Sequence, residues 1–249
     1  MKNYRLIIPS ILLGLFSVSS MADTSAISYE HNYRTYNRVH SDRLYINYGF
    51  SNCLYLGVGV NLINKKNDTL DDVVSYSNIF DIHYRYHVND KFSVTPLLRA
   101  KFYTGVGDDH DYTGEISDPG NSGARYMPGV KLNYTWGPKL SLFAKYNYEI
   151  RKFSHKKGKS RLSTRHRNAL MVGGDYHLSD ALLVSYAFTF KHANYVLYDN
   201  RKSNYEQRLK VAYRAGDHWQ PYLGVEDKAA STERNTREAR LTAGFNYSF

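Results

Sequence analysis

Apolar and polar side chains alternate with a period of two from Ala26 to the last residue, and this pattern restricts the fold severely. In residues 54–62, leucine and valine occupy every second position, with Tyr55, Gly57, Gly59 and Asn61 between them. In the next segment, the alternation puts Tyr76, Asn78, Phe80, Ile82, Tyr84 and Tyr86 on one face and Ser77, Asp81, His83, Arg85 and His87 on the other. Such alternation is typical of β-strands with one apolar and one polar face, and no segment sustains a helical period.

The alternation predicts about twelve strands, an even number, as in bacterial outer-membrane barrels. Each has about ten residues, which is long enough for a tilted strand to cross a bilayer. The expected strands are residues 26–34, 42–50, 54–62, 76–87, 92–103, 124–136, 140–151, 164–176, 181–191, 203–214, 218–227 and 236–249.

The connections between these strands alternate in length. Short turns are expected at Ser51-Asn52, Asn89-Asp90, Gly137-Pro138, Ser179-Asp180 and Gly216-Asp217. Longer polar stretches lie near residues 35–41, 64–73, 104–122, 154–162, 192–202 and 228–235. Outer-membrane barrels place short turns in the periplasm and long loops outside. We therefore predict an all-β fold, a transmembrane antiparallel up-and-down β-barrel of about twelve strands with both termini in the periplasm.

Composition agrees with a barrel better than with a helical membrane protein. The mean hydropathy of −0.55 argues against membrane helices, but strands that alternate apolar and polar residues average to such a value. The chain also has 24 tyrosines, and aromatic side chains with a polar tip settle at membrane interfaces. The expected periplasmic girdle is Tyr48, Phe50, Tyr84, Tyr86, Phe92, Tyr134, Trp136, Tyr176, Tyr213, Trp219 and Tyr247.

Both ends of the sequence carry export signals. Lys2 and Arg5 precede an apolar stretch from Leu6 to Val18, and Ser20-Met21-Ala22 is a small-x-small cleavage site. We predict a signal peptide at 1–22 and a single porin domain at 23–249; a membrane anchor is the alternative, but the apolar stretch is short and interrupted. At the other end Leu241, Ala243, Phe245, Tyr247 and Phe249 share one face, which resembles the signal read by the outer-membrane assembly machinery. An amphipathic strand of a soluble sandwich would explain neither end.

The predicted mature chain is strongly basic. Removing Lys2 and Arg5 leaves 31 basic residues against 23 acidic ones, a net charge of +8. Positive charge of this size implies an acidic partner, which is nucleic acid, anionic lipid or an acidic solute. Export argues against nucleic acid, and no nucleic-acid motif occurs. Cys53 is the single cysteine, so an intramolecular disulfide is impossible.

Strand parity sorts the charges between lipid and lumen. The polar face carries seven acidic residues: Glu30, Asp81, Glu149, Asp175, Glu206, Glu226 and Glu238. The same face carries about twice as many basic residues, and we expect these to line the pore and bind the solute: Arg34, Arg43, Arg85, Arg99, Lys101, Arg125, Lys131, Lys145, Arg151, Arg165, Arg167, Arg208, Lys210 and Arg240, with Arg214 at the end of its strand. Arginine forms two parallel hydrogen bonds with a carboxylate, and acidic sugars carry carboxylates. The alternative is that the lumen acids pair with these side chains and plug the barrel.

Two charged clusters fall in predicted loops. The run His155-Lys156-Lys157-Gly158-Lys159-Ser160-Arg161 would meet lipopolysaccharide phosphates or remain solvated. Asp108, Asp109, Asp111, Glu115 and Asp118 would offer carboxylates to calcium, but they lack the spacing of an EF-hand loop.

Several short motifs carry a family resemblance. Tyr29-Glu30-His31-Asn32-Tyr33-Arg34, followed by Ser41-Asp42-Arg43, is similar to the opening strands of the oligogalacturonate-specific monomeric porins (KdgM type), which include the N-acetylneuraminate outer-membrane channel. Trp219-Gln220-Pro221-Tyr222 resembles their penultimate strand, and Arg237-Glu238-Ala239-Arg240 with Gly244-Phe245-Asn246-Tyr247-Ser248-Phe249 resembles their end. The resemblance implies a monomeric twelve-stranded barrel in a Gram-negative outer membrane, with arginine and lysine tracks that guide acidic oligosaccharides. Asn32 and Glu238 depart from the pattern, where an acid and Gln are expected, so the sugar is left open.

Other functions remain to be weighed. A general anion-selective porin would share the basic lumen. An outer-membrane hydrolase would need a general base, for which His83 with Asp81 and His87 is the best candidate set. An adhesin would have long loops and a sealed lumen. We expect no enzyme activity, catalytic residue, metal or cofactor, and as partners only acidic oligosaccharides, outer-membrane lipid with lipopolysaccharide, and the assembly machinery.

Overall fold

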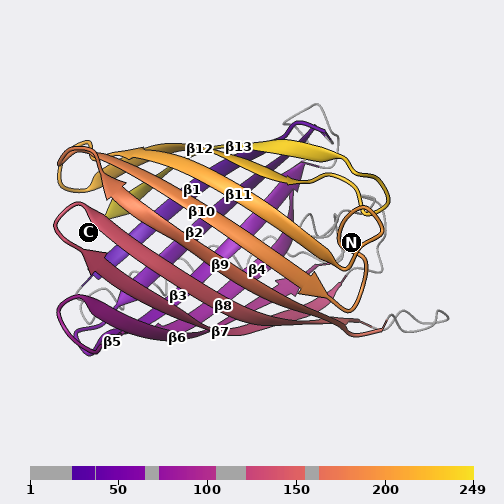
Figure 1. The fold of residues 1–249 in the computed structure, drawn as a ribbon, viewed down its shortest axis with the longest axis horizontal. Helices are drawn as coiled ribbons and strands as arrows, with labels where there is room; N and C mark the ends of the chain where they lie inside the picture. The colour runs from indigo at the N-terminus through magenta and orange to yellow at the C-terminus, as the bar shows by residue number, and fades with distance from the viewer. Residues whose placement is uncertain (1–23, 37, 65–72, 105–121, 155–162) are drawn as a thin grey trace.

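The computed structural model describes residues 24–36, 38–64, 73–104, 122–154 and 163–249, which form one antiparallel sheet (Figure 1). The strands are β1 (Thr24–Arg34), β2 (Val39–Gly49), β3 (Leu54–Asn64), β4 (Val73–Tyr84), β5 (Tyr86–His87), β6 (Phe92–Tyr103), β7 (Gly123–Trp136), β8 (Leu140–Phe153), β9 (Arg165–His177), β10 (Leu182–Ala193), β11 (Ser203–Tyr213), β12 (Trp219–Ala229) and β13 (Arg237–Ser248). Within the described ranges, no helix is long and apolar enough to cross a membrane.

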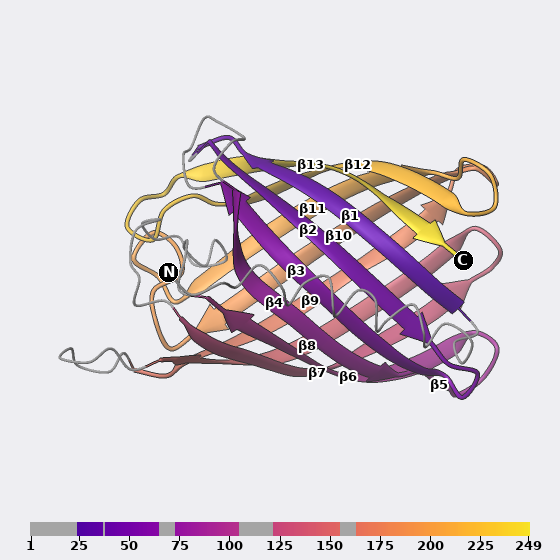
Figure 2. The same ribbon diagram turned by 180° about the vertical axis from the view of Figure 1, so that it is seen from behind.

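The sheet closes on itself. Each strand pairs with its neighbours in the sequence, and β1 pairs with β13 from Ala26↔Ser248 to Arg34↔Arg240. The short β5 continues β4, and β4 itself pairs with β6 beyond it. The prediction of an up-and-down barrel is therefore confirmed, and twelve strands form its wall. The strands are strongly tilted, as both views show (Figures 1 and 2).

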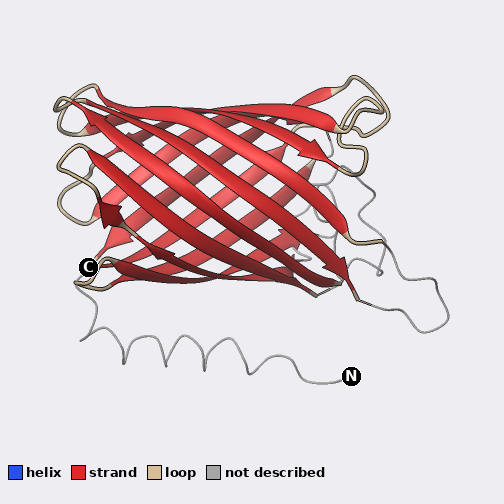
Figure 3. Cartoon of the chain, turned by 60° about the horizontal axis from the view of Figure 1, so that its bottom comes forward, coloured by secondary structure: helices blue, strands red, loops and turns tan. Residues whose placement is uncertain are grey.

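The two rims of the barrel differ, as the connection lengths predict. The short connections and the end of β13 lie at one rim (Figure 3). Thr24, where the described chain begins, pairs with Gly49 at the same rim. One predicted loop is wrong: residues 35–41 do not form a long stretch, because Val39 already pairs with Arg34 and leaves a connection of residues 35–38. Residues 1–23 lie outside the described ranges, so the cleavage site stays a prediction.

A single closed layer gives each strand one outward and one inward face. Leu56, Phe80 and Leu132 are among the large apolar side chains exposed on the outside, where the sequence predicts lipid contact. The alternate residues of each strand point into the barrel, and many of them are buried: Arg125, Arg151 and Arg167 are at most 3% exposed. The interior of this protein is therefore a polar and charged core.

The predicted strand 76–87 needs two corrections. The ladder between β3 and β4 shifts register at Asn61/Leu62, so Asn61 pairs with Ser77, Leu62 pairs with Ser75, and the register skips Tyr76. A bulge of this kind changes which face the residues before it present. Tyr76, predicted on the lipid face, lines a pocket with Asn61 and Lys101 instead. The strand also breaks at Arg85, so only Tyr86 and His87 continue the pairing with β6.

Phe249 extends the last strand beyond its final β residue. Its amide donates to the Ser25 carbonyl at 2.9 Å, and its exposed ring contacts Tyr247 edge-on at 5.0 Å between centroids. Deleting Phe249 is expected to lower the amount of folded barrel severalfold, because both the closing contact to β1 and the terminal aromatic are lost. The measurement is the heat-modifiable band in the outer-membrane fraction, with Phe249→Tyr as the control that keeps the ring. Equal amounts of folded barrel with and without Phe249 would show that assembly does not depend on this residue.

Candidate functional site

Basic side chains form a continuous row on the inward face near the long-loop rim. Side chains of directly paired residues lie on the same face of a sheet. Lys101 pairs with Arg125, Arg125 with Arg151, and Arg151 with Arg165, so four cations stand side by side across β6, β7, β8 and β9. Like charges directly opposite one another destabilise a sheet, so this row requires compensating contacts.

Part of that compensation comes from one carboxylate and several aromatic rings. Glu149 contacts Arg167 at 2.7 Å and Arg125 at 3.7 Å, and all three side chains are buried. The Arg151 guanidinium lies 3.8 Å from the centre of the Tyr103 ring and 4.6 Å from that of Phe153. A cation over an aromatic face is attracted by the ring quadrupole, most strongly where water is excluded. These arginines are therefore structural members of the barrel interior.

A second row runs over β11, β12, β13 and β1. Arg208 pairs with Glu226, Glu226 with Arg240, and Arg240 with Arg34. Glu226 forms an ion pair with Arg240, and Glu238 forms one with Arg34. This row thus contains an acid between two of its bases, in contrast to the first row, in which all four members are basic.

Closer to the short-turn rim, few acidic side chains lie beside the basic ones. Lys131 pairs directly with Lys145, and Lys210 lies on the inward face opposite Gly224. Among the described residues, Lys131, Lys145, Lys210 and Arg208 have no carboxylate within ion-pair distance, although Lys131 lies over Phe143 and Lys210 over Tyr222. Arg85 and Arg214 are exposed at strand ends near this rim. Complete neutralisation of the lumen by its own acids is therefore not observed.

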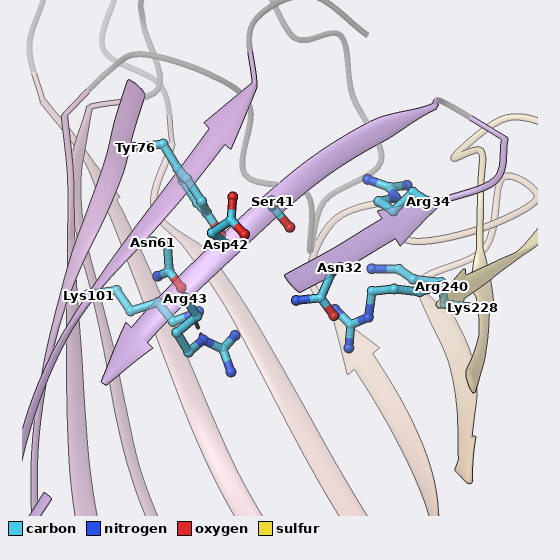
Figure 4. A pocket seen from close by; sticks show the side chains of 10 residues that line it. All are labelled: Asn32, Arg34, Ser41, Asp42, Arg43, Asn61, Tyr76, Lys101, Lys228 and Arg240. Atoms are coloured by element: carbon cyan, nitrogen blue, oxygen red, sulfur yellow. Dashed lines mark hydrogen bonds between the residues drawn. The ribbon is translucent and has the colours of Figure 1, made fainter. Parts of the chain in front are cut away.

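Three inward arginines differ from the buried ones in their accessibility. The side chains of Arg43 and Arg99 are 38% and 37% exposed, and Arg208 is also exposed, although all three lie inside the barrel. Figure 4 shows one polar pocket in this region: Arg34, Lys228 and Arg240 face Arg43 and Lys101 across it. A solute in the water inside the barrel would contact the three exposed arginines, Arg43, Arg99 and Arg208.

Sequence parity missed two inward lysines. Lys191 contacts Glu206 at 2.6 Å, and Lys228 is 4% exposed inside the barrel. Each lies at or beyond the end of its predicted strand, 181–191 and 218–227, where the alternation becomes ambiguous. Both lysines lie two residues after a residue on the inward face, Thr189 and Glu226, so the same alternation extended by two residues would have found them.

The candidate catalytic set is not assembled. His83 Nδ1 lies 3.6 Å from Asp81 Oδ1, which is too long for a hydrogen bond, and its ring stacks on Tyr55. Asp81 instead binds Arg99 and Tyr45, and His87 is exposed in β5. No group of three metal-ligating side chains is found in the described parts of the chain. The predicted loop clusters, 155–161 and Asp108 to Asp118, lie outside them.

Comparison with known proteins identifies the family. The family described as "Oligogalacturonate-specific porin protein (KdgM)" matches residues 16–249. The chain belongs to this family. It is 23% identical over 253 residues to the oligogalacturonate-specific porin KdgM of Dickeya dadantii (strain 3937), an alignment that covers 96% of this chain and 99% of that one.

Two solved structures share the fold. The NanC porin matches with a TM-score of 0.69 at 16% identity, over 89% of this chain and 98% of that one. The KdgM porin in complex with disordered oligogalacturonate matches with a TM-score of 0.63 at 19% identity, over 90% and 99%. The porin family and the closed barrel together indicate a channel of the porin type in the outer membrane of a Gram-negative bacterium.

Proposed function

We propose that this barrel is a monomeric diffusion channel for acidic oligosaccharides, matured by removal of residues 1–22. The observation that carries the proposal is the basic inward face on which Arg43, Arg99 and Arg208 remain accessible to water. Membership of the oligogalacturonate-specific porin family, and the related KdgM porin in complex with oligogalacturonate, support a sugar that carries carboxylates.

Two physical properties of the lumen favour such a solute: its electric field and the hydrogen-bonding geometry of its arginines. In a narrow tube with low-dielectric walls, like charges focus the field and raise the local concentration of the opposite ion. An arginine fork binds a carboxylate with two parallel N–H···O bonds. A carboxylated sugar would therefore enter readily and pass between cations along the wall, provided that each contact is weak enough to release it.

A general anion porin is the second candidate, because the same wall would also attract chloride. The two functions differ in what a sugar does to the ionic current. A specific acidic oligosaccharide occupies the lumen long enough to interrupt the current, whereas a general porin passes small anions without preference for sugar acids.

The test is single-channel recording of the purified barrel in a planar bilayer. We expect anion selectivity in a salt gradient, and resolved interruptions of the current when trigalacturonate is added. The neutral trisaccharide maltotriose is the size-matched control and should produce far fewer interruptions. A cation-selective pore, or equal interruption by both trisaccharides, would contradict the proposal.

A further inference from the structure

Three side chains from neighbouring strands form a hydrogen-bonded unit on the inward face of the barrel. Tyr45 on β2 donates its hydroxyl to Asp81 Oδ2 on β4 at 2.6 Å. Arg99 on β6 donates to the same oxygen through Nε at 3.1 Å and Nη2 at 2.8 Å. Asp81 therefore holds one edge of the guanidinium, while the edge formed by Nη1 and Nη2 still carries N–H donors.

A glycine on the intervening strand makes this unit possible. Tyr45 must cross β3 to reach β4, and Gly57 and Gly59 lie on its path. A Cβ at Gly57 would stand 1.8 Å from the Tyr45 hydroxyl oxygen, and one at Gly59 would stand 2.8 Å from its ring. A larger side chain at either glycine would push the tyrosine away from Asp81.

The same arrangement recurs on the next part of the wall. Tyr222 on β12 donates to Glu30 on β1 at 3.2 Å, and Arg43 on β2 lies 3.6 Å from Glu30. Here the intervening strand is β13, and a Cβ at its Gly244 would stand 2.7 Å from the Tyr222 hydroxyl. In both units a tyrosine, a glycine, an acid and an arginine thus follow one another across four adjacent strands.

The two units adjoin and share one cavity. The second ends at Arg43 and the first begins at Tyr45, two residues apart on β2. Both arginines and both tyrosines line a single cavity together with Glu30, Ser28, Ile79 and Asn246. The acids lie behind the arginines: the Asp81 side chain is 6% exposed and that of Glu30 is 18% exposed, against 37% and 38% for the arginines.

We propose that this cavity is a binding site for one carboxylate-bearing sugar unit, and that Tyr45 and Tyr222 are the positioning residues that give the site its preference for sugar acids. Arg43 and Arg99 bind the carboxylate. Two hydrogen bonds to Asp81 hold the Arg99 guanidinium, whereas Arg43 is held by its ion pair with Glu30 and by a hydrogen bond from its Nε to Asn61 Oδ1 at 3.1 Å. Because both guanidinium groups are held in place, little side-chain entropy is lost when the solute binds. Glu30, which is partly exposed, accepts a hydrogen bond from a ring hydroxyl. The inference rests on the proposed function and names where its selectivity resides.

The test removes only the two hydroxyl groups. Tyr45→Phe and Tyr222→Phe, alone and together, change no charge and little volume. We expect each to shorten the residence time of trigalacturonate in the channel about threefold to tenfold, the effect of one net hydrogen bond. The matched control is Tyr55→Phe, another inward tyrosine, whose hydroxyl has no hydrogen bond among the described residues; it should leave the residence time unchanged.

A second variant tests the positioning without altering any of these polar groups. Gly57→Ala forces the Tyr45 hydroxyl off Asp81 and should reproduce the shortened residence time of Tyr45→Phe. If trigalacturonate blocks the wild type and the two tyrosine variants equally, the inference is overturned while the proposed function stands. If trigalacturonate does not block the wild type at all, the proposed function fails and the inference with it.

Discussion

Neutralising Arg43, Arg99 and Arg208 together is expected to remove more than half of the anion selectivity of the channel. These three inward arginines are exposed to the water inside the barrel, so a permeating ion meets their charge directly. Surface charges act on bulk ions only over a screening length of about 8–10 Å, whereas the walls of a narrow lumen confine the ion within that distance. The measurement is the reversal potential of the triple Arg→Gln variant in a salt gradient across a planar bilayer.

The matched control removes the same charge outside the lumen. Lys91, Lys139 and Lys202 are exposed in connections at the rims, and their triple Lys→Gln variant should keep most of the selectivity. Strand parity alone would have grouped Arg99 with Arg125 and Arg167 for this experiment. The structure separates them, because the latter two are buried against Glu149 and their loss would disturb the fold. Selectivity lost only in the lysine variant would mean that the rims, not the lumen, select the ion.

The second large effect concerns stability. Glu149→Gln is expected to lower the free energy of unfolding by about 3 kcal/mol, because removing one partner of a buried ion pair leaves an uncompensated buried charge. Glu149 lies between Arg167 and Arg125, and the three side chains are between 1% and 7% exposed. The measurement is denaturant unfolding in detergent, followed by tryptophan fluorescence.

An ion pair at the long-loop end of β12 and β13, beside the connection of residues 230–236, provides the control. Arg237 and Asp227 form a two-oxygen contact with both distances at 2.8 Å, but the Asp227 side chain is 43% exposed. Exposed pairs contribute at most about 1 kcal/mol, so Asp227→Asn should have a small effect. Equal destabilisation by the two substitutions would show that burial of the lumen network is not what makes Glu149 important.

These expectations divide the inward arginines into two groups with different roles. Arg125, Arg151 and Arg167 are buried among Glu149 and aromatic rings, and stabilise the long-loop end of the barrel. Arg43, Arg99 and Arg208 are accessible to water, and we propose that these three contact a solute. We therefore propose that one part of the lumen is a structural core and that the part lined by the accessible arginines conducts the solute.

The sequence by itself determined the barrel, because a period of two over twelve segments, joined alternately by short turns and longer loops, is typical of an outer-membrane barrel. Each strand must present one apolar face to lipid and one polar face to the lumen, and closure leaves no edge unpaired. That pattern predicted every strand of the barrel wall, and its parity also placed most of the charged residues of the strands on the inward face. It failed where the period is interrupted, at the bulge that turns Tyr76 inward and at the break at Arg85, and at strand ends, where it missed the inward Lys191 and Lys228.

Only the tertiary structure decided which charges are buried, which acids neutralise which bases, and which strands meet. Strand parity gives the direction of a side chain but not its neighbours, because the register brings together residues that are far apart in the chain. Arg34 forms an ion pair with Glu238, and Tyr222 donates a hydrogen bond to Glu30. The two tyrosine units show this most clearly. Each depends on a glycine in the strand that lies between the tyrosine and the acid. The role of Gly57 and Gly244 follows only from the pairing of the strands, which brings a tyrosine side chain across each glycine.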